Sequence, residues 1–192
     1  LRAYAYFELV RYFGKVPLHL EPVQGRDDAT LPLSSEEEIY NQIVSDATQA
    51  VNLLPPKSAQ EAGRATSGAA RTLLANVYIV QKKWAEAETL LMEVYNSNEY
   101  QLIPDYADVF STSTGNKNNV ESVFEIEFLE GSAGRNGTFL YNFMPRPMTS
   151  EELVTITRTS NAQPLTGEGN NIPTPDIIAP YEPGDERKDA SI

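Results

Sequence analysis

The hydrophobic positions between residues 63 and 102 follow a helical spacing in two successive runs. They are Ala70, Leu73, Leu74, Val77 and Tyr78 in the first run, and Trp84, Ala87, Leu91, Val94 and Tyr95 in the second. Intervals of three and four residues put such side chains on one face of a helix. Thr66 is expected to cap the first helix, because its hydroxyl can accept a hydrogen bond from a backbone N–H of the first turn. Asn96 and Asn98 are expected to end the second. The pattern predicts two helices folded back on each other.

The offsets within these runs are similar to those of a tetratricopeptide unit, which carries Leu-Gly-x-x-Tyr on its first helix and Ala-x-x-x-Phe on its second. Leu74-Ala75-x-x-Tyr78 and Ala87-x-x-x-Leu91 have this spacing, and their alanines are the small residues at which the helices would cross closely. Two positions depart from the repeat, because Arg71 stands in place of its Trp and Glu99 in place of its Pro. An ordinary αα-hairpin within a larger core is therefore an open alternative.

Two further helices are predicted ahead of this pair. The first covers residues 1–13, places Tyr6, Leu9, Val10 and Phe13 on one face, and ends at Gly14. The second begins after Ser35, because Ser35 and Glu38 have the spacing of a capping box. Its expected buried stripe consists of Tyr40, Ile43, Val44, Ala47, Val51 and Leu54, and two prolines close it.

The pattern changes after residue 103. Residues 104–110 predict one short helical turn, and the alternation of apolar and acidic residues over 121–128 predicts a half-buried strand. Residues 131–137 are rich in glycine, and prolines recur beyond residue 144, where 175–181 is expected to hold one short helix. The sequence therefore predicts a mainly α fold with long irregular loops and a little β, divided into a helical scaffold over 1–103 and a loop-rich region over 104–192 of the same domain.

Composition narrows the classes of protein that fit this pattern. Of 192 residues 41% are hydrophobic, yet no apolar run approaches the length of a membrane span. The absence of cysteine excludes disulfides and thiolate sites from this sequence. Fifteen basic and 27 acidic residues give a net charge of −12, which disfavours nucleic acid as a partner. Because the sequence starts at Leu1, inside a helical pattern, we interpret it as part of a longer protein.

Few residues suit catalysis or metal binding. His19 is the only histidine, so the sequence lacks the residues for a catalytic triad or an imidazole metal cluster. Glu125 and Glu127 lie on one face of the predicted strand, where two carboxylates could act as the acid and nucleophile of a glycosidase. A solvated strand surface explains that pair more simply. We therefore expect no enzyme activity, no cofactor and no metal.

Several separated segments together resemble the SusD/RagB family of nutrient-binding lipoproteins. The matching segments are Arg2-Ala3-x-x-Tyr6-Phe7 continuing to Val16-Pro17-Leu18, Glu38-Ile39-Tyr40-x-x-Ile43, Gly63-Arg64-Ala65-Thr66 continuing to Val77-Tyr78, Trp84, Tyr100-x-Leu102 with Tyr106 and Phe110, Glu121-Ser122-x-Phe124-Glu125-Ile126, Pro173-Thr174, and Gly184-Asp185-x-Arg187. Their order and spacing cover essentially the whole sequence. The resemblance implies tetratricopeptide-like helical pairs with long irregular insertions.

The resemblance also implies a function. Members capture a glycan, an oligosaccharide or polysaccharide, at the outer-membrane surface of the cell and deliver it to a partner SusC-like TonB-dependent transporter. They are longer than this sequence and are held at the membrane by a lipid on an N-terminal cysteine, which this sequence does not contain. Alternatives that stay open are capture of peptides, as in the RagB branch, a tetratricopeptide adaptor that binds protein tails, and a carboxylate hydrolase.

Residues 135–146 contain the most promising ligand loop. A sugar ring offers one apolar face and a rim of hydroxyls, so its capture needs aromatic platforms together with amide side chains. Phe139, Tyr141 and Phe143 are the candidate platforms, and Asn136 and Asn142 the candidate hydrogen-bonding groups. The alternation of the three aromatics is also typical of the buried face of a strand, so that structural role stays open for them.

Overall fold

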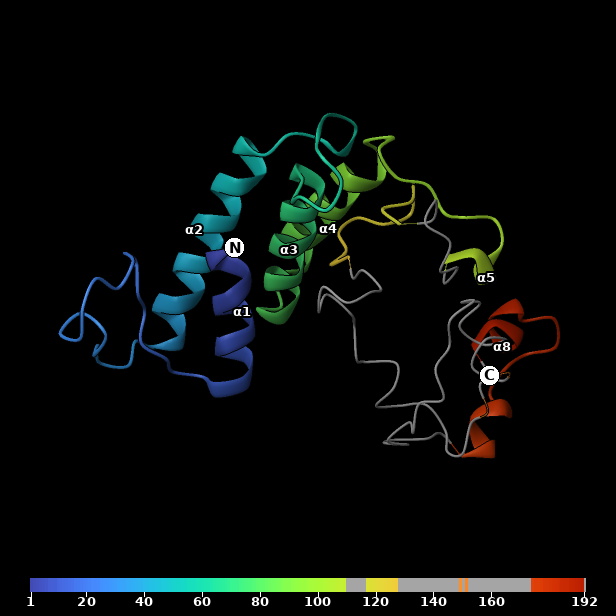
Figure 1. Ribbon diagram of the computed structural model, residues 1–192, viewed down its shortest axis with the longest axis horizontal. Helices are drawn as coiled ribbons and strands as arrows, with labels where there is room; N and C mark the ends of the chain where they lie inside the picture. Colours follow the sequence, from blue (N-terminus) through green and yellow to red (C-terminus); the bar gives the residue numbers. More distant parts are fainter. Residues whose placement is uncertain (110–116, 128–148, 150, 152–173, 192) are drawn as a thin grey trace. The chain divides into compact units, whose positions relative to one another are not determined.

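The computed structural model describes residues 1–109, 117–127, 149, 151 and 174–191 (Figure 1). Its helices are α1 (Arg2–Phe13), α2 (Glu36–Leu53), the 3-10 helix η1 (Lys57–Ala59), α3 (Ser67–Val80), α4 (Trp84–Tyr95), α5 (Tyr106–Val109), the 3-10 helix η3 (Pro175–Ile178) and α8 (Glu186–Ser191). The β structure within these residues is a single isolated bridge between Pro17 and Leu33. The prediction of a mainly α fold is confirmed.

The chain divides into two compact units, Leu1–Tyr100 and Gln101–Ile192, which are described separately. In the first unit each helix packs against the next in sequence, α1 on α2, α2 on α3 and α3 on α4 (Figure 1). The expected division after residue 103 into a helical scaffold and a loop-rich region stays a prediction.

The core of the first unit lies between α1, α2 and α3. Ile39, Ile43 and Val77 are its largest fully buried side chains. Ala75 and Ala87 are 0% and 2% exposed where α3 packs against α4, which confirms them as the small residues that allow close packing. Apolar burial of this kind is the main force that holds helices together.

Local hydrogen bonds fix the helix ends where the sequence predicts them. Ser35 Oγ accepts a hydrogen bond from the backbone N–H of Glu38 at 3.2 Å, and Ser35 N donates to the Glu38 carboxylate at 2.8 Å, which completes the capping box. The Glu38 carboxylate accepts hydrogen bonds from the backbone N–H and from the hydroxyl of Ser35, and these lower its pKa because they favour its charged form. Thr66 Oγ1 accepts from Ala69 N at 3.1 Å. Asn98 adopts a left-handed φ of 59° soon after α4 ends.

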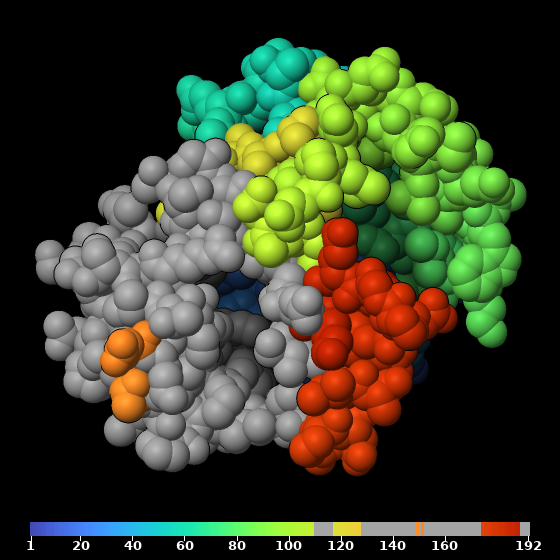
Figure 2. Space-filling model, turned by 90° about the vertical axis from the view of Figure 1, so that its right-hand side faces the viewer, coloured from blue at the N-terminus to red at the C-terminus, as the bar shows by residue number. Residues whose placement is uncertain are grey.

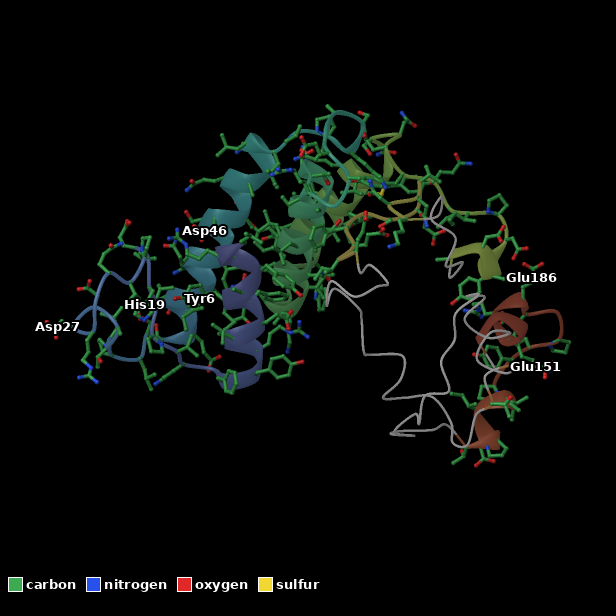
Figure 3. The ribbon with its side chains drawn as sticks, in the orientation of Figure 1. Tyr6, His19, Asp27, Asp46, Glu151 and Glu186 are labelled. Atoms are coloured by element: carbon green, nitrogen blue, oxygen red, sulfur yellow. The ribbon has the colours of Figure 1, made fainter. Side chains whose placement is uncertain are left out.

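The irregular segment between α1 and α2, residues 14–35, is here called the excursion, and polar side chains hold it through hydrogen bonds. Arg2 donates from Nε and Nη2 to the two carboxylate oxygens of Asp46 at 2.7 and 2.8 Å, and from Nη1 to the carbonyl of Leu20. The hydroxyl of Tyr6 accepts from His19 N at 2.6 Å and lies 3.3 Å from Pro17 O (Figure 3). The hydrogen bonds from Arg2 lower the pKa of Asp46. Side chains on α1 and α2 therefore hold the start of this excursion.

The predicted faces of α1 and α4 need correction. On α1, Leu9 and Phe13 are 38% and 71% exposed, and the buried positions are Ala3, Tyr6, Phe7 and Val10. On α4, Trp84, Leu91 and Tyr95 are exposed and Ala87 alone is buried. The physical reason is that α4 packs mainly on one neighbour, α3, so its buried face is narrower than its apolar face. The exposed helix is visible in green at the right of Figure 2.

The predicted strand is also wrong over the residues that can be described. Residues 121–127 form no strand. The side chain of Asn119 instead accepts hydrogen bonds from the backbone N–H groups of Glu121 and Ser122 at 2.9 and 3.1 Å, which makes this a turn. Phe124 and Ile126 are 49% and 66% exposed. Alternation alone does not make a strand, because a strand needs a neighbouring chain segment with which to pair.

Within the second unit the described helices are short, and α5 and η3 bury no residue. α5 and α8 contact each other, and α5 and η3 confirm the short helices predicted near residues 104–110 and 175–181. Residues 174–191 are drawn in red in Figure 2. Arg187 donates to Asp185 at 2.8 Å, and this hydrogen bond lowers the pKa of Asp185.

Candidate functional site

The ligand loop predicted from the sequence lies outside the described residues. All five of its candidate contacts, Asn136, Phe139, Tyr141, Asn142 and Phe143, fall between residues 128 and 148. Their role in ligand binding therefore stays a prediction. A pocket built from other side chains is present in the first unit.

We call this feature the hairpin pocket, because the residues that line it belong to the start of α3, the end of α4 and the connection that follows α2. It encloses about 480 Å³. Its walls come from Pro56 and Lys57, from Ser67, Gly68 and Arg71, and from residues between Glu93 and Tyr100. Its volume is within the range of roughly 300 to 1,000 Å³ that is usual for small-molecule sites.

Tyr100 packs directly on the first turn of α3. A Cβ atom at Gly68 would lie 2.1 Å from the Tyr100 hydroxyl and 2.8 Å from its Cζ, so only a glycine leaves room for the ring. The same hydroxyl lies 3.3 Å from Thr66 Oγ1, within hydrogen-bond distance. Lys57 Nζ lies 5.5 Å from the centre of the Tyr100 ring, a cation–π distance. One aromatic ring thus joins the α2–α3 connection, α3 and the end of α4.

Two carboxylates tie the remaining walls together. Glu93 on α4 accepts a hydrogen bond from Arg71 Nε on α3 at 2.7 Å, and the two side chains are 50% and 28% exposed. Glu99 accepts from the backbone N and the hydroxyl of Ser58 at 2.7 and 2.8 Å. Ion pairs this exposed stabilise a fold by only about 0.2 to 1 kcal/mol. Both carboxylates and the guanidinium of Arg71 line the pocket.

One signal in the sequence could have indicated this place. Arg71 and Glu99 are the two residues that depart from the tetratricopeptide pattern, and both line the hairpin pocket. The repeat's Trp and Pro would fill such a position with apolar atoms. Here the Arg71–Glu93 ion pair and the two hydrogen bonds between Ser58 and Glu99 take their place, and we call the latter pair the Ser58–Glu99 clamp. Sequence reasoning missed the pocket because its walls come from three separate segments, of which two are helix ends.

The other groups considered from the sequence do not assemble into a reactive centre among the described residues. Glu125 accepts a hydrogen bond from the backbone N–H of Asn118, a structural role in a turn. Glu127 is exposed, and the backbone N–H of His19 is bonded to Tyr6. In the part of the chain that the structure describes, no helix is both long and apolar enough to cross a membrane.

Comparisons with a family model and with known proteins all match SusD-like proteins. A family model of SusD-like proteins, described as starch-binding and associating with the outer membrane, matches residues 1–79. The SusD-like protein P25 of Formosa agariphila is 25% identical over 217 residues, which cover 100% of this chain and 41% of that protein. A SusD-like protein of Bacteroides ovatus is 31% identical over 140 residues, 67% of this chain and 25% of that protein. The chain thus spans less than half the length of either relative.

Solved structures agree with these relatives. A SusD-like protein from Bacteroides fragilis has a TM-score of 0.69 at 29% identity, over 94% of this chain and 33% of its own. A laminarin-binding SusD-like protein has a TM-score of 0.58 at 32% identity, over 64% of this chain and 28% of its own. A protein crystallised with xylogluco-oligosaccharide has a TM-score of 0.63 at 28% identity, over 74% of this chain and 31% of its own. The fold, the family model and both relatives lead to one conclusion: this chain belongs to the SusD-like family.

Proposed function

We propose that this chain is part of a protein that binds oligo- or polysaccharides at a bacterial outer-membrane surface and delivers them to a TonB-dependent transporter. The observation that carries the proposal is the structural likeness to a SusD-like protein over 94% of the chain. Similar proteins include one that binds laminarin and one crystallised with a xylogluco-oligosaccharide. The description of the matching family supports the outer-membrane location. A lipid anchor elsewhere in the protein is the proposed attachment.

The fold suits capture rather than catalysis. Packed helices form a rigid frame, and loops held on a rigid frame can keep binding groups in a fixed arrangement. In the proposed protein the loop that contains Asn136, Phe139, Tyr141, Asn142 and Phe143 contacts the glycan. Aromatic rings there would pack against the apolar faces of sugar rings, while the amides would bond to hydroxyls. The glycan leaves this site intact.

Calorimetric titration of the full-length protein with laminarin oligosaccharides, xyloglucan oligosaccharides, maltoheptaose and short peptides tests this proposal. We expect saturable binding to at least one glycan, with no release of reducing ends during incubation. Tyr141→Ala should weaken binding about tenfold or more, as loss of an aromatic anchor does at other interfaces. Tyr12→Ala is the matched control, because Tyr12 is a 76% exposed aromatic on α1 outside the predicted loop.

Three results would contradict the proposal in different ways. Binding to peptides with none to glycans would favour the RagB-like alternative. Cleavage of a bound glycan would show that the protein is a hydrolase. For the transporter, co-purification from detergent-solubilised outer membranes should recover a TonB-dependent transporter with the tagged protein. Recovery of the tagged protein without a transporter under mild detergent would remove the delivery step from the proposal.

A further inference from the structure

We propose that the hairpin pocket is a second saccharide site, separate from the predicted loop, which binds one or two neutral sugar residues of a glycan. This inference rests on the proposed function, because glycan binding supplies the class of ligand. Its location is new, since it places a binding site within the helical scaffold itself. Four properties of the pocket support it: balanced charge, directional polar groups, an aromatic wall and fixed walls.

The charge of the lining favours a neutral ligand. The pocket contains two cations, Lys57 and Arg71, and two carboxylates, Glu93 and Glu99. Arg71 is paired with Glu93 at 2.7 Å, so neither sign dominates. The chain as a whole carries a net charge of −12, which disfavours an anionic ligand further.

The start of α3 does not by itself attract an anion. Ser67 N donates to Pro55 O at 2.9 Å and Ala69 N donates to Thr66 Oγ1 at 3.1 Å, so two donors of the first turn are already used. Tyr100 covers Gly68 between them. An anion would also meet Glu93 and Glu99. A polar ligand without charge fits this surface better.

The polar groups that line the pocket suit neighbouring hydroxyls. A guanidinium and a carboxylate are planar groups that can engage two oxygen atoms at once, and Arg71 and Glu93 lie side by side. The side chain of Asn96 makes no hydrogen bond within the described part of the chain and lines the same pocket. Ser67 contributes a hydroxyl to the lining. Donors and acceptors are therefore both present, as a rim of sugar hydroxyls requires.

Tyr100 adds an aromatic surface, and its surroundings hold it in place. The contact with Gly68, the hydroxyl distance of 3.3 Å to Thr66 and the nearby Lys57 ammonium restrict the ring. The clamp between Glu99 and Ser58 holds the adjacent backbone. Because these walls are fixed before a ligand arrives, little conformational entropy is lost on binding.

The test is a titration of the full-length, ¹⁵N-labelled protein with laminaribiose, cellobiose and maltose, followed by amide chemical shifts. We expect saturable shifts at Ser67–Arg71 and Glu93–Tyr100 with at least one of the three disaccharides. Arg71→Met keeps the apolar part of the side chain and removes the guanidinium, so affinity should fall about tenfold or more. Arg64→Met is the matched control, because Arg64 forms the exposed ion pair with Glu61 outside the pocket.

A second variant separates loss of binding from loss of folding. Ser67→Phe places a ring in the pocket without removing the Arg71–Glu93 or Ser58–Glu99 contacts, and it should abolish the disaccharide shifts while the protein keeps its circular dichroism spectrum. Shifts that survive both Ser67→Phe and Arg71→Met would overturn the inference. So would the absence of shifts in a protein that binds laminarin or another long glycan, and in that case the proposed function stands. Absence of binding to every glycan would overturn both.

Discussion

The two ends of the first unit are held together by different chemistry. Between α1 and α2 the contact is mainly apolar, with Ile39 and Ile43 fully buried and the Arg2–Asp46 pair at its edge. Where α3 begins and α4 ends, Ala87 is the buried apolar residue that α4 contributes, and polar pairs with exposed side chains join the segments. The second arrangement borders a pocket of about 480 Å³, which no residue of α1 or α2 lines.

This difference shows that tight apolar packing and an open polar junction can occur within one small helical unit. Close packing stabilises because each buried atom has neighbours on every side, so a change there affects the whole unit. A polar junction built on exposed pairs contributes little to stability. Exposed polar side chains at the hairpin end can therefore be replaced with little loss of stability.

The largest effect on stability should come from the apolar contact between α1 and α2, which we call the apolar end. Ile43→Ala removes a side chain that is 0% exposed and leaves a cavity, so the free energy of unfolding should fall by about 2 to 5 kcal/mol. Urea denaturation followed by circular dichroism measures this. Ile79→Ala is the control. Because Ile79 is 37% exposed on α3, its truncation should lower the free energy of unfolding much less. Equal losses from the two variants would show that this core does not dominate stability.

At the hairpin end, Gly68→Ala should change stability in opposite directions depending on whether Tyr100 is present. In the native protein the new methyl group meets the Tyr100 hydroxyl at 2.1 Å and its ring carbons at 2.8 and 2.9 Å, and the displacement should cost about 1 to 3 kcal/mol. In a Tyr100→Ala background that clash is absent, so the same substitution should stabilise by about 0.5 to 1 kcal/mol, the usual gain of Ala over Gly in a helix. A double-mutant cycle by urea denaturation measures both. The same sign in both backgrounds would contradict the packing of Tyr100 on Gly68.

The Arg2–Asp46 pair should give a smaller effect that depends on pH. Its hydrogen bonds lower the pKa of Asp46 below the ordinary 3.8, so the pair stabilises the fold above that value and the contribution disappears as pH falls through the lowered pKa. Asp46→Asn should cost about 1 kcal/mol at pH 7 and progressively less below about pH 4. Thermal unfolding at several pH values measures this. Asp28→Asn, in the exposed segment between α1 and α2, is the control and should leave the stability at pH 7 unchanged.

The smallest effect on stability should come from the pocket's ion pair. Arg71→Met removes one partner of an exposed pair and should change the free energy of unfolding by about 0.5 kcal/mol or less. Urea denaturation of this variant beside the Ile43→Ala protein gives the comparison directly. A loss of 2 kcal/mol or more would mean that the hairpin end is as important for stability as the apolar end.

Features that depend on adjacent residues could be predicted from the sequence. The capping box at Ser35 and Glu38, the cap at Thr66 and the left-handed Asn98 all involve residues within a few positions of each other, and each is confirmed. The limits of α1 to α4 follow from such signals together with the three- and four-residue periodicity.

Features that depend on distant neighbours could not be predicted in the same way. Trp84 and Tyr95 have the spacing of buried residues but are exposed, because periodicity does not reveal how many helices surround α4. The alternation over 121–127 forms no strand among the described residues, and Asn119 makes a turn at its start instead. Tyr100 contacts Gly68, which lies 32 positions earlier in the sequence, and no rule based on neighbouring residues predicts that contact. The loop around Tyr141 lies outside the described residues, so binding measurements are needed to test its predicted ligand contacts.

The clamp between Ser58 and Glu99 has a consequence for proteolysis. It brings together the two ends of a segment that contains α3, the turn at Lys82 and Lys83, and α4. Lys82 is exposed and has a φ of 59°, so that tip is a natural site for trypsin. After cleavage there, the clamp and the burial of Ala87 would keep both pieces associated, and they would separate only under denaturing electrophoresis.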